Sequence, residues 1–271
     1  MAKKAFLIDV DRCNGCHNCQ IACKDEHCGQ SWLPYAAEQP DTGQFWCKVE
    51  QTVHGTVPKV NMTYLPLIGA QDDALADFAS DVVTVREDGV MYIDPEKARG
   101  RKDIADRFDG VFWNEELQIP QGCAGCAHLL DDGWAVPRCV DACAMGALRF
   151  VDVDEVAEEL AEELAKAERL APGSHVYYLN LPKRWIAGQV IDPMRDEVVI
   201  GAKVTLVDAA GNKRETLTDD FGDFWFKKIE PGKYSLTVED DRFVTRQFDA
   251  DCTDEDVNLG VMKVYELGEL K

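Results

Sequence analysis

Two groups of four cysteines are the residues of this sequence whose types and spacing indicate chemistry. The first group consists of Cys13, Cys16, Cys19 and Cys23. The second group consists of Cys123, Cys126, Cys139 and Cys143. Two, two and three residues separate successive cysteines of the first group, and two, twelve and three separate those of the second. Closely spaced thiolates of this kind bind metal ions or iron–sulfur clusters.

The first group has the spacing of bacterial ferredoxins. In that pattern a tight loop brings three thiolates to one [4Fe–4S] cluster, and the fourth cysteine binds a neighbouring cluster. The residues between the cysteines, such as Asn14 and Gly15, are small or polar, which suits a backbone folded closely around a cluster. We interpret this group as an iron–sulfur site, with a zinc knuckle or free thiols as the alternatives.

The second group is a less specific signal, because paired cysteines around a spacer also describe a tetrahedral zinc site. As the partner of the first group, it predicts two [4Fe–4S] clusters that exchange their fourth ligands. The predicted ligands of cluster 1 are Cys13, Cys16, Cys19 and Cys143. The predicted ligands of cluster 2 are Cys123, Cys126, Cys139 and Cys23. Spacing leaves open that each group binds its own cluster, or that Cys28 or Cys47 supplies a fourth ligand.

The other cysteines and the histidines have simpler interpretations. A lone cysteine such as Cys252 is usually a small buried hydrophobic residue. Cys28 and Cys47 are interpreted as spectators. His17 and His128 lie beside predicted ligands. We expect that they at most contact a cluster and do not ligate it, since the five histidines form no ligand pair.

Length and charge limit the function classes. A chain of 271 residues with a formal net charge of −21 is long enough for two domains, and its charge disfavours contact with nucleic acid or anionic lipid. Neither a signal peptide nor an apolar stretch long enough to span a membrane is found. Eleven cysteines without a signal peptide indicate a reducing compartment. We expect a cytoplasmic protein, unless it crosses a membrane folded beside a partner with a twin-arginine signal.

The predicted fold class is α+β, with two domains. Residues 1–172 are predicted to form a ferredoxin-like iron–sulfur domain with an insert at about 29–120. Alternating segments before the first cysteine group and after the second, AFLIDV and GALRFVDV, predict strands. Acidic residues in the first turn and apolar residues at helical intervals predict a helix over 154–170 that closes this domain.

The sequence pattern changes at residue 173. Residues 173–271 are predicted to form a linker followed by an antiparallel β-sandwich. Short alternating segments such as GAKVTLVDAAG and GKYSLTVED are separated by turn signals such as EPGK. No glycine-rich phosphate loop, GxSxG or HExxH motif occurs, so we expect no catalytic residue in this chain.

The second cysteine group, in the context GCAGCAHLLDDGWAVPRCVDACAMGALRF, resembles the iron–sulfur subunits of molybdopterin oxidoreductases of the dimethyl sulfoxide reductase type. DPEKARGRKD, GVFWNEE and VYYLNL extend the resemblance over nearly the whole chain, to iron–sulfur small subunits of the pyrogallol phloroglucinol transhydroxylase type. The terminal sandwich is similar to carboxypeptidase regulatory-like and transthyretin-like domains.

The resemblance implies that this chain carries [4Fe–4S] clusters and that the chemistry occurs on a separate large subunit. That subunit would hold molybdenum with two pterin guanine dinucleotides and bind a phenol. Related complexes include reductive dehydroxylases of catechols. The wider family has further cysteine groups in the middle of the chain, whereas residues 48–122 contain none and Phe108 stands where a Cys-Pro pair is expected. We therefore predict fewer clusters than the relatives have.

These features predict the electron-transfer subunit of a cytoplasmic molybdenum enzyme complex that acts on polyhydroxylated aromatics, with an external electron donor as a further partner. The alternative is a structural or assembly module with zinc or iron sites, docked to its catalytic partner through the sandwich. A free-standing ferredoxin is disfavoured by the sandwich and the large insert.

Overall fold

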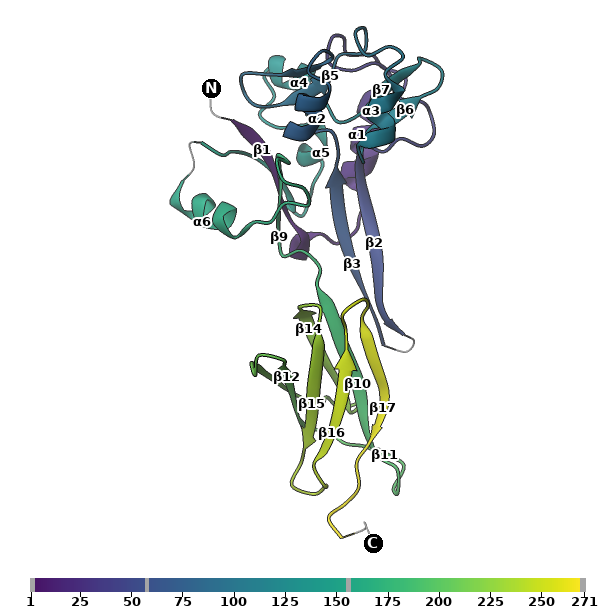
Figure 1. The fold of residues 1–271 in the computed structure, drawn as a ribbon, viewed down its shortest axis with the longest axis vertical. Coiled ribbons are helices and arrows are strands. Elements are labelled where there is room, and N and C mark those ends of the chain that lie inside the picture. Colours follow the sequence, from purple (N-terminus) through teal and green to yellow (C-terminus); the bar gives the residue numbers. More distant parts are fainter. Residues whose placement is uncertain (1–2, 57–58, 155–156, 269–271) are drawn as a thin grey trace. The chain divides into compact units, whose positions relative to one another are not determined.

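The computed structural model describes residues 3–56, 59–154 and 157–268. They divide into two compact units (Figure 1). The N-terminal unit comprises the described residues of 1–51 and 63–181, and the C-terminal unit comprises those of 52–62 and 182–271. No helix in these described ranges is long and apolar enough to cross a membrane.

The N-terminal unit contains a three-stranded sheet. Its central strand is β1 (Lys4–Asp9), which pairs antiparallel with β8 (Leu148–Asp152) and parallel with β9 (Val176–Leu179). The middle residues of β1, from Ala5 to Ile8, are apolar and almost inaccessible, as expected for a central strand. β1 and β8 confirm the two strands that were predicted to flank the cysteine groups.

Short helices follow the cysteine loops. The turn η1 (Val10–Arg12) connects β1 to the first loop. The helices are α1 (Asn18–His27), α4 (Ala127–Asp131) and α5 (Arg138–Asp141). α1 and α5 pack side by side (Figure 1). This packing places the second half of each cysteine group in one hydrophobic core.

The segment between the two cysteine groups is folded into hairpins and short helices. Its strands are β2 (Cys47–Thr56), β3 (Lys59–Ile68), β4 (Val83–Val85), β5 (Met91–Ile93), β6 (Phe112–Asn114) and β7 (Ile119–Gln121), paired two by two in that order. Its helices are α2 (Asp73–Phe78) and α3 (Lys102–Arg107). A second apolar core, which includes Leu75, Met91 and Ile104, supports this segment.

The helix predicted over 154–170 extends from Glu158 to Lys166 as α6 (Glu158–Lys166), and residues 155–156 of the predicted range lie outside the described residues. The helix ends where Ala167 adopts an extended backbone, with ψ at 142°. None of its residues is buried, and an ion pair of 2.7 Å from Glu163 to Arg149 connects it to β8. α6 is therefore a solvated helix with one charged contact to the sheet.

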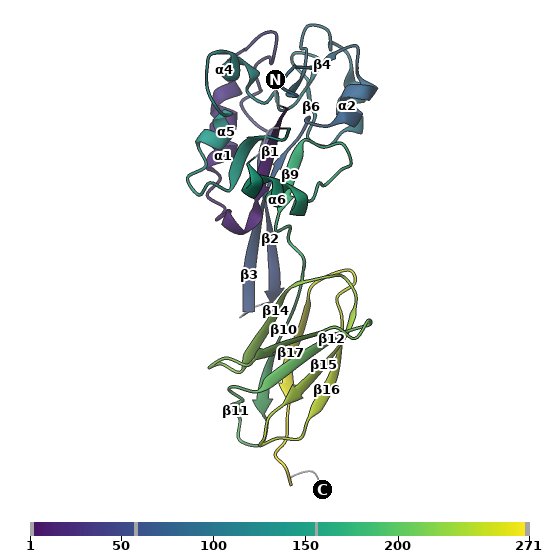
Figure 2. The same cartoon turned by 90° about the vertical axis from the view of Figure 1, so that its left-hand side faces the viewer.

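The C-terminal unit is a sandwich of two four-stranded sheets (Figure 2). The first sheet contains β10 (Arg184–Asp192), β11 (Glu197–Val198), β14 (Asp223–Ile229) and β17 (Val257–Lys263). The second contains β12 (Lys203–Asp208), β13 (Lys213–Leu217), β15 (Lys233–Glu239) and β16 (Arg246–Asp251). Inward-facing residues such as Val204, Phe224 and Leu236 fill the space between the sheets.

One strand pairing differs from the predicted antiparallel arrangement. β17 runs parallel to β10, with Ile186 opposite Val257. The preceding strand, β16, belongs to the other sheet, so the chain crosses between the sheets and does not return through a hairpin. Adjacent strands need not be antiparallel when the connection is a crossover.

A carboxylate links His54 of β2 to Trp185 within the C-terminal unit. Asp256 accepts a hydrogen bond of 2.9 Å from the Trp185 backbone N–H through Oδ1, and its Oδ2 pairs with the His54 ring. The His54 ring stacks on Trp185, with ring centroids 4.9 Å apart. Residues of β2 thus contribute to the packing of the sandwich.

We expect Asp256→Ala to lower the free energy of unfolding of the C-terminal unit by about 1–3 kcal/mol, because a part-buried N–H and the His54 ring lose this carboxylate. Urea unfolding followed by tryptophan fluorescence measures the change. Asp254→Ala is the matched control, since Asp254 is exposed. Equal urea midpoints of unfolding for Asp256→Ala and Asp254→Ala would show that the Asp256 carboxylate does not stabilise this unit.

Candidate metal centre

The first set of sulfurs combines three cysteines of the first group with one of the second. Cys13, Cys16, Cys19 and Cys143 line the same small cavity. Burial raises the pKa of the Cys13 thiol, and the thiolates of Cys19, Cys143 and Cys16 raise it further against the opposing effect of the Gly15 N–H. The four sulfurs therefore lie close enough together for the charge of one to affect the pKa of another.

The second set has the reciprocal composition, with three cysteines of the second group and Cys23 of the first. Burial raises the pKa of Cys23 well above its usual value, and Cys139, Cys123 and Cys126 raise it further. Burial also raises the pKa of Cys123 to about 12, with a contribution from Cys139. The structure thus brings the eight predicted ligands together in two sets of four, and in each set the fourth cysteine comes from the other group.

Helix periodicity explains how one group serves two sets. Cys19 and Cys23 lie one turn apart on α1, and both are only 6% exposed. Residues four apart share a helix face but lie at different heights along its axis. Cys139 in α5 and Cys143 just after it have the same separation. The third and fourth cysteines of each group therefore reach different sets.

Both cysteine loops contain a glycine that the packing requires. Gly15 has φ of +70°, and a Cβ there would lie 2.3 Å from the Tyr64 ring. Gly125 has φ of +59°, and a Cβ there would lie 2.5 Å from a methyl group of Val90. Any other residue would combine left-handed strain with a clash. The insert therefore packs directly against both loops.

Backbone N–H groups are directed at the sulfurs. The Gly125 N–H donates to Cys123 Sγ over 3.3 Å, and the Leu148 N–H donates to Cys143 Sγ over 3.4 Å. The Cys47 N–H lowers the pKa of Cys23 against the larger effect of burial. Such donors stabilise thiolates and metal-bound sulfur.

The sulfur sets fit an iron–sulfur cluster. All eleven cysteines are free. The four sulfurs of the second set are buried, so they can be thiolates there only when a cationic group neutralises them. Near Cys23, buried nitrogens of His27 and Trp46 have no protein partner, which suits donors facing cluster sulfur. Within the described residues, no three His, Cys, Asp or Glu side chains are placed to hold a single metal ion.

Cys47 is a neighbour of both sets, which its isolated position in the sequence did not indicate. It is the first residue of β2 and is 1% exposed. Hydrogen bonds from its side chain to Cys139 and Cys19, together with burial, raise its pKa well above the usual value. Cys28, in contrast, contacts Asp41 near the surface, and Cys252 is buried in the sandwich as predicted.

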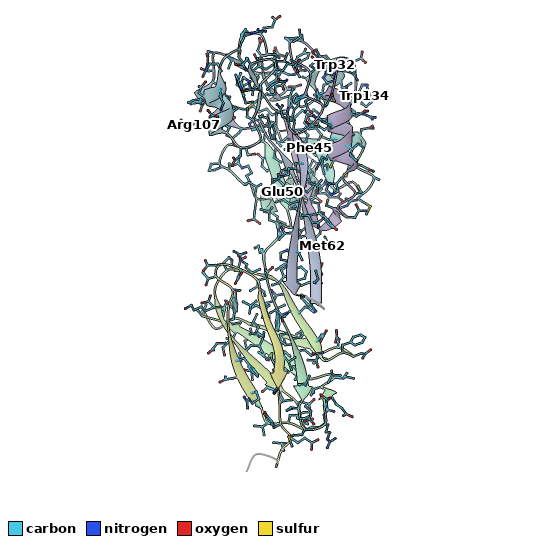
Figure 3. The ribbon with its side chains drawn as sticks, turned by 90° about the vertical axis from the view of Figure 1, so that its right-hand side faces the viewer. Trp32, Phe45, Glu50, Met62, Arg107 and Trp134 are labelled. Carbon is cyan, nitrogen blue, oxygen red and sulfur yellow. The ribbon has the colours of Figure 1, made fainter. Side chains whose placement is uncertain are left out.

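The two predicted histidine neighbours have different surroundings. His17 lines the cavity of the first set and has a left-handed backbone at the start of α1. His128 Nε2 lies 3.0 Å from Glu26 Oε1, and its ring stacks on Trp32 with centroids 4.4 Å apart. Trp32 and Trp134 lie on the same side of the N-terminal unit (Figure 3).

A buried amide that sequence reasoning missed fixes the loop of the second set. Gln71, 3% exposed, donates 2.7 Å hydrogen bonds to the carbonyl oxygens of Cys123 and Met91. Its Oε1 accepts a 3.1 Å bond from the Met91 N–H. No spacing or motif distinguishes this glutamine in the sequence.

A separate cleft of about 590 Å³ lies in the N-terminal unit. Phe45, Trp46, Glu50 and Tyr178 are among its lining residues, and Figure 3 labels Phe45 and Glu50 near β2. None of the eight clustered cysteines lines it, so this opening is distinct from the sulfur sets.

Comparison with known proteins gives relatives for the whole chain and for its C-terminal unit. The chain is 32% identical to the pyrogallol hydroxytransferase small subunit of Pelobacter acidigallici, over 89% of this chain and 92% of that protein. It is 27% identical to a tetrathionate reductase subunit of Salmonella typhimurium, over 67% and 74% of the two proteins. It is also 27% identical to a component of the anaerobic dimethyl sulfoxide reductase of Escherichia coli, over 60% and 80%. Residues 185–261 match the carboxypeptidase regulatory-like domain family.

We expect Gln71→Ala to destabilise the N-terminal unit by about 1–3 kcal/mol, because two buried carbonyl groups and one N–H lose their partner. Amide hydrogen exchange should accelerate at Met91, whose N–H is bonded to Gln71. Gln30→Ala, at an exposed position, is the matched control. Unchanged exchange at Met91 would show that the amide does not fix this loop.

Proposed function

Because the chain is a member of the family of iron–sulfur small subunits that includes the pyrogallol hydroxytransferase small subunit, we propose that it transfers electrons within a molybdopterin oxidoreductase complex. The observation that carries the proposal is the arrangement of eight cysteines in two sets of four with exchanged fourth members. This is the ligand arrangement of two-cluster ferredoxins. The ferredoxin-like character of residues 1–172 is part of the proposal.

In the proposed assignment, cluster 1 is held by Cys13, Cys16, Cys19 and Cys143. Cluster 2 is held by Cys23, Cys123, Cys126 and Cys139. A [4Fe–4S] cluster supplies one-electron redox chemistry when it is bound. The contributions of the chain are to supply the thiolates, to bury them, and to direct N–H groups at the sulfurs.

The two sites differ in their exposure to solvent. Cys16 of the first set is exposed and Cys13 and Cys143 are partly exposed, whereas all four cysteines of the second set are buried. Solvent exposure and hydrogen bonds to sulfur are among the factors that set cluster potentials, over about −700 to +450 mV. We infer that the two clusters have different potentials.

We further propose that catalysis takes place on a large partner subunit that carries molybdenum and two pterin guanine dinucleotides. We propose a polyhydroxylated aromatic, pyrogallol or a catechol, as the substrate of the complex, and the name of the relative from Pelobacter acidigallici supports pyrogallol. Transhydroxylation needs no net electrons, whereas reductive dehydroxylation needs an external donor. The free cysteines support a reducing compartment, and we place the complex in the cytoplasm.

The test of this function is metal analysis of the complex purified without oxygen from its native source. We expect about eight irons per copy of this protein beyond any cluster of the partner, and about one molybdenum. About four irons would reject one of the two cluster sites. Zinc without iron or molybdenum would reject electron transfer and leave an assembly module with structural metal sites.

Single substitutions test the exchange of fourth ligands. Cys143→Ser is expected to change the same electron paramagnetic resonance signal as Cys16→Ser, because both residues are assigned to cluster 1. Cys23→Ser is expected to change the signal that Cys126→Ser changes. Cys252→Ser, in the sandwich, should leave both signals intact. If Cys143→Ser instead matches Cys126→Ser, each cysteine group binds its own cluster.

A further inference from the structure

The cleft of about 590 Å³ in the N-terminal unit is walled by segments that lie far apart in the sequence. Its lining residues belong to segments 45–50, 67–72, 109–112 and 170–178. Backbone hydrogen bonds connect these walls. The Gly69 N–H donates to the Trp46 carbonyl oxygen over 3.4 Å, and the His175 N–H donates to the Gln71 carbonyl oxygen over 2.8 Å. The cleft is therefore a preformed part of the fold, as ligand sites usually are.

Two glycines stand where two of the walls meet. Both Gly69 and Gly110 line the cleft. A Cβ on Gly69 would lie 2.5 Å from Gly110 Cα, and Gly110 itself has φ of +80°. Other residues would clash at the first position and be strained at the second. The walls meet here as bare backbone, so no side chain from this point fills the cleft.

Aromatic and aliphatic side chains form much of the lining. Trp46 and Tyr178 are buried, and Phe45 and Phe112 are partly exposed. Leu170 also lines the cleft and is 54% exposed, so this apolar lining continues to solvent. Such a surface favours a ligand with apolar groups, because their burial removes apolar area from water.

The charged lining residues are mainly acidic. They are Glu50, Asp72, Asp109 and Lys48, and Glu50 lies near Phe45 by β2 (Figure 3). Lys48 Nζ lies 3.1 Å from Glu50 Oε1. One lysine against three carboxylates leaves a formal charge of −2 in the lining. The electrostatic potential of the cleft therefore favours a cationic group.

A lysine or arginine side chain has the chemistry that both parts of the lining require. Its aliphatic stem can pack on apolar and aromatic surface while its charged end reaches a carboxylate. A cation can also lie over an aromatic ring face. A second copy of this chain is a poor occupant, because its net charge of −21 repels an acidic surface.

We propose that this cleft is a docking site for a lysine- or arginine-bearing segment of the large catalytic subunit. The proposal rests on the function proposed above, since that function supplies the partner. Gln71 lines the cleft and donates a 2.7 Å hydrogen bond to the Cys123 carbonyl oxygen. The docked segment therefore lies one side chain away from the loop of the second sulfur set.

Neutral substitutions test the charge of the cleft. Glu50→Gln combined with Asp109→Asn removes the formal charge of the lining, and both residues are exposed, so the core is not altered. We expect the Kd for the large subunit to rise about tenfold at low ionic strength, and less at high salt because ions screen the charges. The measurement titrates each tagged protein, without oxygen, with large subunit released from the native complex.

The matched control is Asp77→Asn. Asp77 is an exposed carboxylate of the same unit and does not line the cleft. We expect this variant to bind the large subunit as the wild type does. Circular dichroism of every variant shows whether the fold is retained.

Carboxylate labelling of the wild type gives a second measurement that needs no variant. Carbodiimide coupling to glycine ethyl ester, read by mass spectrometry, compares the intact complex with the separated protein. We expect Glu50 and Asp109 to be labelled in the separated protein and protected in the complex.

Two results would overturn the proposal. One is an unchanged Kd for the double variant. The other is equal labelling of Glu50 and Asp109 in the complex and in the separated protein. A wild-type protein that purifies from its native source without a large subunit is a separate result, because it rejects the proposed function itself.

Discussion

The antiparallel pairing of β1 with β8 is the interaction on which the rest of the N-terminal unit depends. Its register places Ile8 opposite Leu148, and the Asp9 N–H donates to the Ala147 carbonyl oxygen over 2.8 Å. β1 ends shortly before the first cysteine group and β8 begins shortly after the second. Pairing these two strands therefore brings together loops that are more than a hundred residues apart in the sequence. A shift of register by one residue would exchange the two buried faces of β1 and displace the two cysteine loops relative to each other.

Exchange of the fourth cysteines follows from this arrangement and from helix geometry. α1 and α5 pack against one another. Cys23, one turn after Cys19 in α1, and Cys143, just after the end of α5, each join the cysteines of the other group. Cys47, at the start of β2, lies in the same apolar core as cysteines of both sets. The two sulfur sets and the start of the insert are thus parts of one core, which includes cysteines of both groups.

The sequence predicted those features that have a local signal. Cysteine spacing identified the eight clustered residues, and alternating apolar residues identified β1, β8 and the strands of the sandwich. Features created by long-range contacts carried no such signal. Cys47 is a lone cysteine in the sequence, and Gln71 resembles any other glutamine until the fold buries its amide against Cys123. The parallel pairing of β17 with β10 depends on a crossover between sheets, which strand patterns cannot reveal.

Anomalous diffraction at the iron absorption edge, from crystals of the complex grown without oxygen, tests the central claim most directly. The account predicts two cubane clusters in this protein. Cys143 should ligate the cluster held by Cys13, Cys16 and Cys19, and Cys23 should ligate the other. Two clusters that are each bound by the four cysteines of a single group, or tetrahedral zinc in place of iron, would contradict it.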